Sequence, residues 1–118
     1  MITLPQVQNS TLFNTGKIYL IRTPVNGRYG ILRLYNMMVS NQLGFEWEPD
    51  EEVWVVMFNE HRSRLRILHS DLQGYDLTTR ITYSGRFKVK LEKMECSPDK
   101  ITREELRSLI LNASCRFV

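Results

Sequence analysis

The sequence has little of what secreted and membrane proteins require. Its two cysteines, Cys96 and Cys115, are too few for a disulfide scaffold and form no C-x-x-C pair. The longest strongly apolar run, Val53 to Phe58, is far shorter than the roughly 20 residues of a membrane-spanning helix. No signal-peptide pattern opens the chain. These absences predict a cytoplasmic protein with reduced thiols and no membrane contact.

Sequence motifs of catalysis are missing as well. The chain contains no glycine-rich phosphate loop, no G-x-S-x-G and no H-E-x-x-H. We therefore predict a protein that is not an enzyme, with no catalytic residue, no metal site and no cofactor. One alternative stays open, a small nuclease-like enzyme that uses His69 and Asp71. A histidine at such a position is more often a hydrogen-bonded core residue than a base.

What the sequence does contain is enough for one globular domain. Of its 118 residues, 42% are hydrophobic and 25% are charged. A chain of this size and composition can bury a core that needs no disulfide or structural metal ion. From Val53 to Met94, four runs of β-forming residues are separated by three polar breaks, a pattern typical of an antiparallel meander. A further strand is predicted over Lys17–Thr23, because Pro24 cannot continue a ladder.

Two helices are expected, one before and one after the meander in the sequence. Apolar residues recur at spacings of three and four over Arg28–Asn41. Near the C-terminus, Thr102 and Glu105 form the pattern of a capping box, so a second helix should run from Thr102 to about Ala113. We predict an α+β fold, an antiparallel sheet of about five strands with both helices on one face. The expected organisation is a flexible arm (1–16), a single domain (17–113) and a loose end (114–118).

The charge is unevenly distributed along the chain. The net charge is +3 overall, but the segment from Glu60 to Lys93 holds eight basic and four acidic residues and is therefore net +4. Just before this segment stands an acidic run: Glu46, Glu48, Asp50, Glu51 and Glu52.

Alternation along the predicted strands assigns the basic residues to one face of the sheet. Leu65 and Ile67 are expected to point toward the helices, as are Phe87, Val89 and Leu91 of the last predicted strand. The opposite, exposed face would then carry a set of basic side chains: Arg64, Arg66, Arg80, Lys88 and Lys90. Such a face could neutralise the phosphates of a nucleic acid, or it could be an ordinary solvated face.

Two aromatic residues, Phe45 and Trp47, lie within the acidic run and suggest a further alternative. They could form the docking surface of a protein-interaction module with no nucleic-acid role. They could equally fill a gap in the core or cover the open edge of the sheet.

One set of residues resembles the pattern R-L-K-I-L-x-W-D-x-x-G-F/Y…K-R…G-R-F of the small TnpB accessory proteins of the sixty-sixth insertion-sequence family. The residues that carry this resemblance keep the family's order and spacing: Arg64-Leu65-Arg66-Ile67-Leu68, Asp71, Gly74-Tyr75, Arg80 and Gly85-Arg86-Phe87. The segments Ile18–Leu20, Asn26–Ile31 and Ile101–Leu111 are also similar, so the likeness spans almost the whole chain.

The resemblance implies a bacterial accessory protein of transposition, encoded beside a separate, larger transposase that would be its partner. It also assigns Gly30, Gly74, Gly85 and Phe87 to the backbone and the core. The remaining basic residues are the candidates for contact with double-stranded DNA, the transposase, or both. Together with the charge pattern, this gives the predicted binding residues: Arg28, Arg62, Arg64, Arg66, Arg80, Arg86, Lys88 and Lys90.

Overall fold

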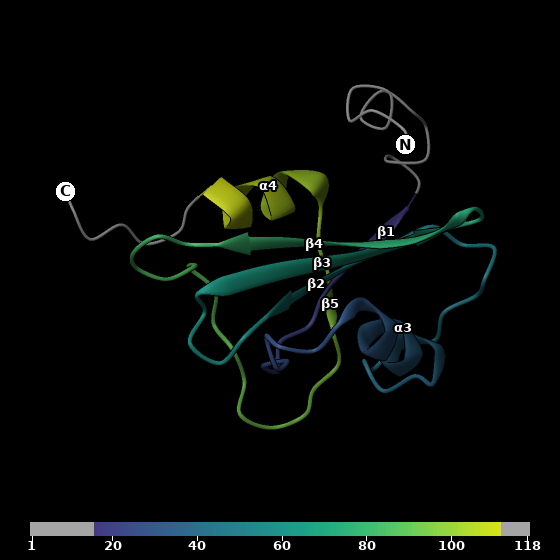
Figure 1. Cartoon of the computed structure of the whole chain (residues 1–118), viewed down its shortest axis with the longest axis horizontal. Helices are drawn as coiled ribbons and strands as arrows, with labels where there is room; N and C mark the ends of the chain where they lie inside the picture. Colours follow the sequence, from purple (N-terminus) through teal and green to yellow (C-terminus); the bar gives the residue numbers. More distant parts are fainter. Residues whose placement is uncertain (1–15, 112–118) are drawn as a thin grey trace.

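A computed structural model describes residues 16–111 and shows one five-stranded sheet with two helices (Figure 1). The sheet is mixed but mostly antiparallel, and its strand order is β4-β3-β2-β1-β5. The predicted α+β class is thus confirmed. The elements are β1 (Lys17–Leu20), α3 (Ile31–Val39), β2 (Val53–Phe58), β3 (Arg64–Asp71), β4 (Gly74–Ile81), β5 (Asp99–Lys100) and α4 (Arg103–Leu111).

The first three strands of the predicted meander are present in antiparallel register. Strand β2 pairs with β3 from Val53↔Ser70 to Phe58↔Leu65, and β3 pairs with β4 as far as Asp71↔Gly74. The two-residue turn between β3 and β4 is held by Asp71, whose Oδ1 accepts from the backbone N–H of Gln73 at 2.8 Å. Strand β1 pairs with β2 in parallel because the connection between them includes α3.

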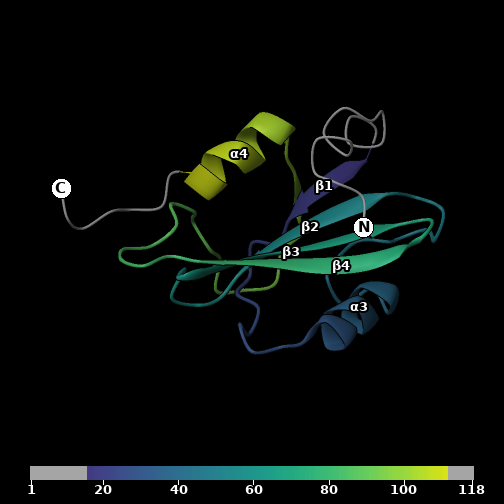
Figure 2. The same cartoon turned by 45° about the horizontal axis from the view of Figure 1, so that its top comes forward.

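The two helices lie on opposite faces of the sheet (Figure 2), so the prediction of both on one face is wrong. Val53, Val55 and Met57 pack in one core with α3, whereas Val56 and Phe58 pack in a second core with α4. The physical reason is the composition of β2. It is apolar at every position, so both of its faces require cover.

The fourth predicted strand of the meander is also wrong. Strand β4 ends at Ile81, and after Gly85, whose φ of +76° favours glycine, the chain crosses the end of the sheet. Phe87 is fully buried and meets Phe58 edge-to-face with the ring centroids 5.6 Å apart. Val89 and Leu91 pack against the same core. The inward direction predicted for these three side chains is therefore confirmed, although the fifth strand is β5.

Helix α3 is shorter than its predicted range of Arg28–Asn41, and its buried residues are Leu34 and Met38. Helix α4 begins at the predicted capping box. Thr102 Oγ1 accepts from the backbone N–H of Glu105 at 3.1 Å, and Glu105 Oε1 accepts from that of Thr102 at 2.9 Å.

The predicted arm over 1–16, apart from its last residue, and the predicted loose end over 114–118 lie outside the described residues. Within the described range, neither helix has the length and apolarity to cross a membrane.

Candidate functional site

The predicted basic residues do not share one face of the sheet. Arg64 and Arg66 lie on the face that holds Leu68 and α3, because alternate residues of a strand point to the same side. Arg80 is paired with Leu65, which belongs to the α4 core, and so lies on the other face. Lys88 and Lys90 lie outside the strands. The expectation of a single basic sheet face is therefore wrong.

Arg66 is part of the protein interior, with only 8% of its surface exposed. Its Nη1 donates to the carbonyl oxygens of Gly27, at 3.2 Å, and of Tyr29, while its Nε donates to Thr79 Oγ1 at 3.3 Å. Burial, with a smaller contribution from the charge of Arg64, lowers the pKa of Arg66 from its usual value. The guanidinium remains charged at neutral pH, and it fastens the loop before α3 to the sheet.

Arg64 and Arg62 hold neighbouring segments in the same way. Arg64 Nη1 donates to the carbonyl of Gly27 at 3.2 Å. Arg62, whose φ is +56°, sits in the turn between β2 and β3, and its Nη1 donates to the carbonyls of Phe87 and Val89 at 3.4 and 3.3 Å. The segment after β4 is thus attached to the β2–β3 turn.

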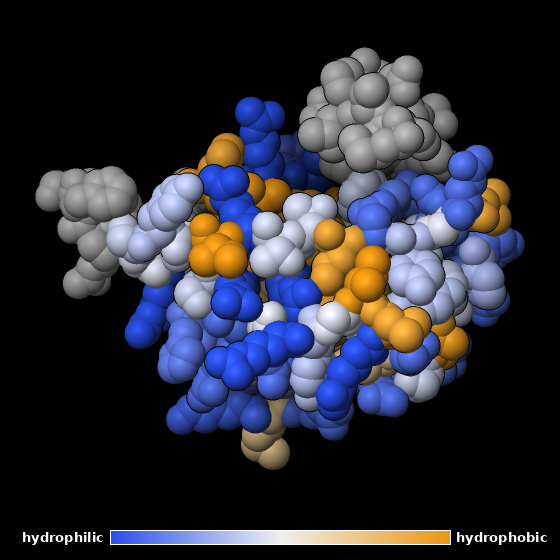
Figure 3. All heavy atoms as spheres, viewed as in Figure 1, coloured by the Kyte–Doolittle hydropathy of each residue, from blue (hydrophilic) through white to orange (hydrophobic). Residues whose placement is uncertain are grey.

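These contacts gather the basic residues at one end of the sheet, where β2 and β4 end and β3 begins. Arg28, His61 and Arg64 line one surface hollow there, and Arg62, Lys90 and Lys93 line a second. Glu60 lies at both hollows and Glu92 at the second, so the cations outnumber the carboxylates in the second hollow by only one. Figure 3 shows mainly hydrophilic side chains over the lower left of the molecule, where Figure 1 places the β2–β3 turn and the segment after β4. We call this surface the basic end: Arg28, Arg62, Arg64, Arg80, Arg86, Lys88, Lys90 and Lys93.

Five of the predicted residues at the basic end are exposed. None of them takes part in an ion pair among the described residues, in contrast to Arg22, which pairs with Glu92 at 3.6 Å. These five are available to a partner: Arg28, Arg80, Arg86, Lys88 and Lys90.

The opposite end of the sheet is acidic. The run from Glu46 to Glu52 leads into β2 there, Asp71 ends β3, and Asp76 lies near the start of β4. We call this end of the sheet, with the residues that lie around these carboxylates, the acidic end. Lys17 Nζ pairs with Glu51 Oε2 at 2.8 Å. This hydrogen bond and the charge of Glu51 raise the pKa of Lys17 above its usual value.

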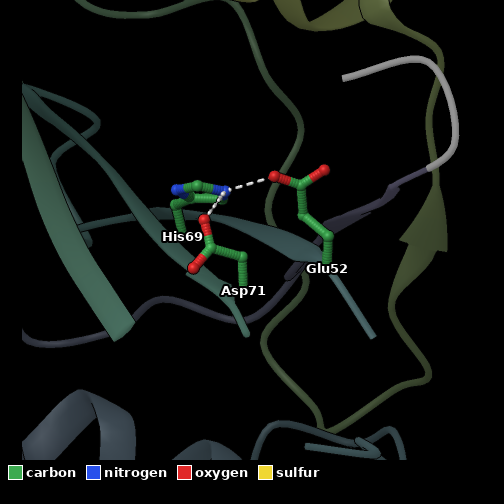
Figure 4. Close-up of side chains that lie close together, drawn as sticks. All are labelled: Glu52, His69 and Asp71. Carbon is green, nitrogen blue, oxygen red and sulfur yellow. Dashed lines mark hydrogen bonds and ion pairs between the residues drawn. The ribbon is translucent and has the colours of Figure 1, made fainter. Parts of the chain in front are cut away.

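Within the acidic end, three ligand-type side chains converge (Figure 4). His69 Nε2 lies 2.7 Å from Glu52 Oε2 and 3.9 Å from Asp71 Oδ2. His69 Nδ1 lies 3.2 Å from Asp76 Oδ2. The sequence pointed to His69 and Asp71 but missed Glu52. The signal that could have found it is the register, since Val53↔Ser70 puts the preceding Glu52 opposite Asp71.

Phe45 and Trp47 are packed against the α3 core. Phe45 stacks on Tyr19 with the ring centroids 4.3 Å apart, and Trp47 meets Tyr35 edge-to-face at 5.8 Å. Of the three interpretations offered by the sequence, their packing agrees with the one in which they fill a gap in the core.

No curated protein and no solved structure matches the chain. The family model described as IS66 Orf2 like protein, TnpB_IS66, matches residues 16–116. That range includes both ends of the sheet and all of the basic residues discussed above. The chain therefore belongs to the IS66 Orf2-like family and is an accessory protein associated with IS66 transposition.

Proposed function

We propose that this protein is a non-catalytic accessory factor whose basic end binds the phosphate backbone of duplex DNA. The transposase of the same element is its proposed protein partner. The observation that carries the proposal is the group of exposed cations at one end: Arg28, Arg80, Arg86, Lys88 and Lys90. Lysine and arginine side chains that neutralise phosphates release condensed counterions, and this release drives binding without regard to sequence.

The three arginines of the β2–β3 hairpin have a supporting role in this proposal. Arg62, Arg64 and Arg66 each donate to backbone carbonyls of other segments. Their hydrogen bonds fix the loop that carries Arg28 and the segment that carries Lys88. Replacing one of these arginines would free the segments that carry Arg28 and Lys88. DNA binding would therefore weaken even if the replaced arginine does not itself touch DNA.

The salt dependence of DNA affinity tests the proposal. If five cations contact phosphates, a plot of log affinity against log salt has a slope of about −4.5, and affinity falls about 500-fold between 50 and 200 mM salt. Replacing Arg80 and Arg86 together by alanine should reduce the slope by about 2. Fluorescence anisotropy with a labelled duplex measures both quantities.

The matched control removes the same charge elsewhere. Lys100 and Arg107 are exposed in β5 and α4, so the Lys100→Ala, Arg107→Ala double variant should keep the wild-type slope. If both double variants change the slope equally, the basic end is not the contact. If DNA binding is absent and the transposase is bound even at high salt, the partner at this surface is the protein.

A further inference from the structure

Four side chains of the acidic end lie in one layer on the α4 side of the sheet. Trp54 of β2, His69 of β3 and Asp76 of β4 are successive partners across three strands, since Trp54 pairs with His69 and His69 with Asp76. The rings of Trp54 and His69 are stacked with their centroids 3.7 Å apart. Asp71 follows His69 by two residues and so shares its face. The imidazole is held in one plane, with a carboxylate on each side.

This arrangement carries an excess of negative charge in a protected place. Exposed side-chain fractions are 7% for Glu52, 11% for His69 and 23% for Asp71. Even a protonated imidazole leaves the two protected carboxylates of Glu52 and Asp71 with one cation, and the carboxylate of Asp76, whose side chain is 69% exposed, adds a further negative charge. Among residues 16–111, no lysine or arginine forms an ion pair with Glu52, Asp71 or Asp76. Like charges directly opposite each other across two strands are destabilising.

A second observation comes from the other oxygen of Glu52. Oε1 is buried and has no hydrogen-bond partner among the described residues. A carboxylate has about four acceptor sites, but here only Oε2 is used, toward His69. A buried carboxylate with so few partners is costly unless a cation compensates it.

We propose that Glu52, His69 and Asp71 bind a divalent transition-metal ion, with Zn²⁺ the best match to one imidazole nitrogen and two carboxylate oxygens. The ligand atoms would be Glu52 Oε2, His69 Nε2 and Asp71 Oδ2, and water would complete the coordination. Imidazole together with carboxylates is a donor set that Zn²⁺ accepts. This site departs from the sequence-based expectation of no metal, which could not take the position of Glu52 into account.

The spacing of the three ligand atoms fits such an ion with small adjustments. Bonds of about 2.0–2.1 Å in tetrahedral geometry place ligand atoms about 3.3 Å apart. The observed separations are 2.7 Å and 3.9 Å from His69 Nε2, and all three atoms lie within 4.8 Å of one another. Rotation of the partly exposed Asp71 carboxylate and a small shift of the buried Glu52 carboxylate cover these differences.

Asp76 supplies the outer contact that a metal-binding histidine commonly has. Its Oδ2 lies 3.2 Å from His69 Nδ1. A proton on Nδ1 that is donated to Asp76 leaves the lone pair of Nε2 directed toward Glu52 and Asp71. Asp76 is therefore a positioning residue for the ion, and the bound metal would fasten the start of β2 to the end of β3.

Zn²⁺ titration of the full chain, after treatment with a chelator, tests the proposal. A competition assay with a chromophoric chelator should give one saturable site per chain. Glu52→Gln and Asp71→Asn keep the size of each side chain and should weaken binding at least tenfold, and Asp76→Asn should weaken it about tenfold. The matched controls Glu48→Gln and His61→Gln change exposed residues and should leave affinity unchanged.

A wild-type measurement keeps the test decisive if a variant does not fold. In NMR spectra, the imidazole signals of His69 should shift on addition of one equivalent of Zn²⁺, while those of His61 stay in place. The proposal is overturned if no saturable binding occurs, if Glu52→Gln and Asp71→Asn bind as the wild type does, or if the signals of His61 shift instead.

Discussion

The two ends of the sheet treat charge in different ways. At the basic end, Arg62 and Arg64 use their guanidinium groups to hold backbone carbonyls of other segments, and the buried Arg66 of the same hairpin does likewise. Further cations there are exposed. At the acidic end, Glu52, Asp71 and Asp76 surround a single imidazole. The comparison teaches that part of a charge cluster can belong to the fold, and that only the contacts of each side chain distinguish this part from the part available to a partner.

The separation of charge follows from the antiparallel order of the chain. Successive strands of a meander reverse direction, so residues before β2, after β3 and at the start of β4 meet at one end. Residues between β2 and β3, and those after β4, meet at the other end. The acidic run precedes β2 and the hairpin arginines follow it. Two oppositely charged stretches of sequence thereby become two oppositely charged ends.

The largest expected effect is at the basic end, in Phe87→Ala. This residue fixes the segment that carries Arg86 and Lys88 by filling the α4 core beside Phe58. Loss of a buried phenylalanine side chain should lower the free energy of unfolding by about 4 kcal/mol, as measured by urea denaturation. Tyr83→Ala, at a fully exposed ring of the same segment, is the control and should have little effect. A loss below 1 kcal/mol in Phe87→Ala would contradict this packing.

The next largest effect on stability distinguishes an arginine that donates to backbone carbonyls from one that is exposed. Arg66→Met should lower the free energy of unfolding by about 3 kcal/mol, because the carbonyls of Gly27 and Tyr29 lose a charged donor. Arg80→Met should change it by less than about 0.5 kcal/mol, as is usual for an exposed residue. Chemical denaturation compares the two variants, and equal losses would remove the distinction.

At the acidic end, removal of a charge should raise the stability of the fold rather than lower it. In the presence of a chelator, Asp71→Asn should raise the free energy of unfolding by about 0.5 kcal/mol, because it relieves repulsion with Glu52 across the strands. The amide oxygen can still accept the turn hydrogen bond from Gln73. Thermal unfolding, followed by circular dichroism, measures the change. A clear loss of stability in this variant would show that the carboxylates are not in conflict.

The smallest effect concerns Lys17, a cation of the acidic end. Because Glu51 raises the pKa of Lys17 above its usual value, the pair contributes stability at lower pH and loses this contribution as the pH rises through the folded-state pKa. An NMR titration of Lys17 should give a higher midpoint in the wild type than in Glu51→Gln. Equal midpoints in the two proteins would show that Glu51 has no influence.

Features of the fold that depend on local chemistry could be predicted from the sequence. The turn at Asp71–Gly74, the periodicity over α3 and the capping box at Thr102 each act within a few residues, and each is present. The sequence did not reveal which helix covers which side of the sheet. The apolar run of β2 is compatible with cover on one face or both, and alternation alone does not say which helix covers which face.

The candidate site was harder to predict from the sequence, because it depends on the register in which the strands pair. Arg66 follows the same pattern as an exposed strand residue, and only the placement of the loop at Gly27 makes it a buried donor. Likewise, Glu52 stands at the end of an acidic run that looks solvated. Its partner His69 is 17 residues away and is brought near by the pairing of β2 with β3.

The most direct test of the difference between the two ends is an NMR titration of the protein with a short duplex DNA at low salt. We predict that backbone amide signals shift at residues 60–64 and 80–90 of the basic end and stay in place at residues 46–52 and 71–76 of the acidic end. Shifts confined to the acidic end, or none at either end, would contradict the proposed function.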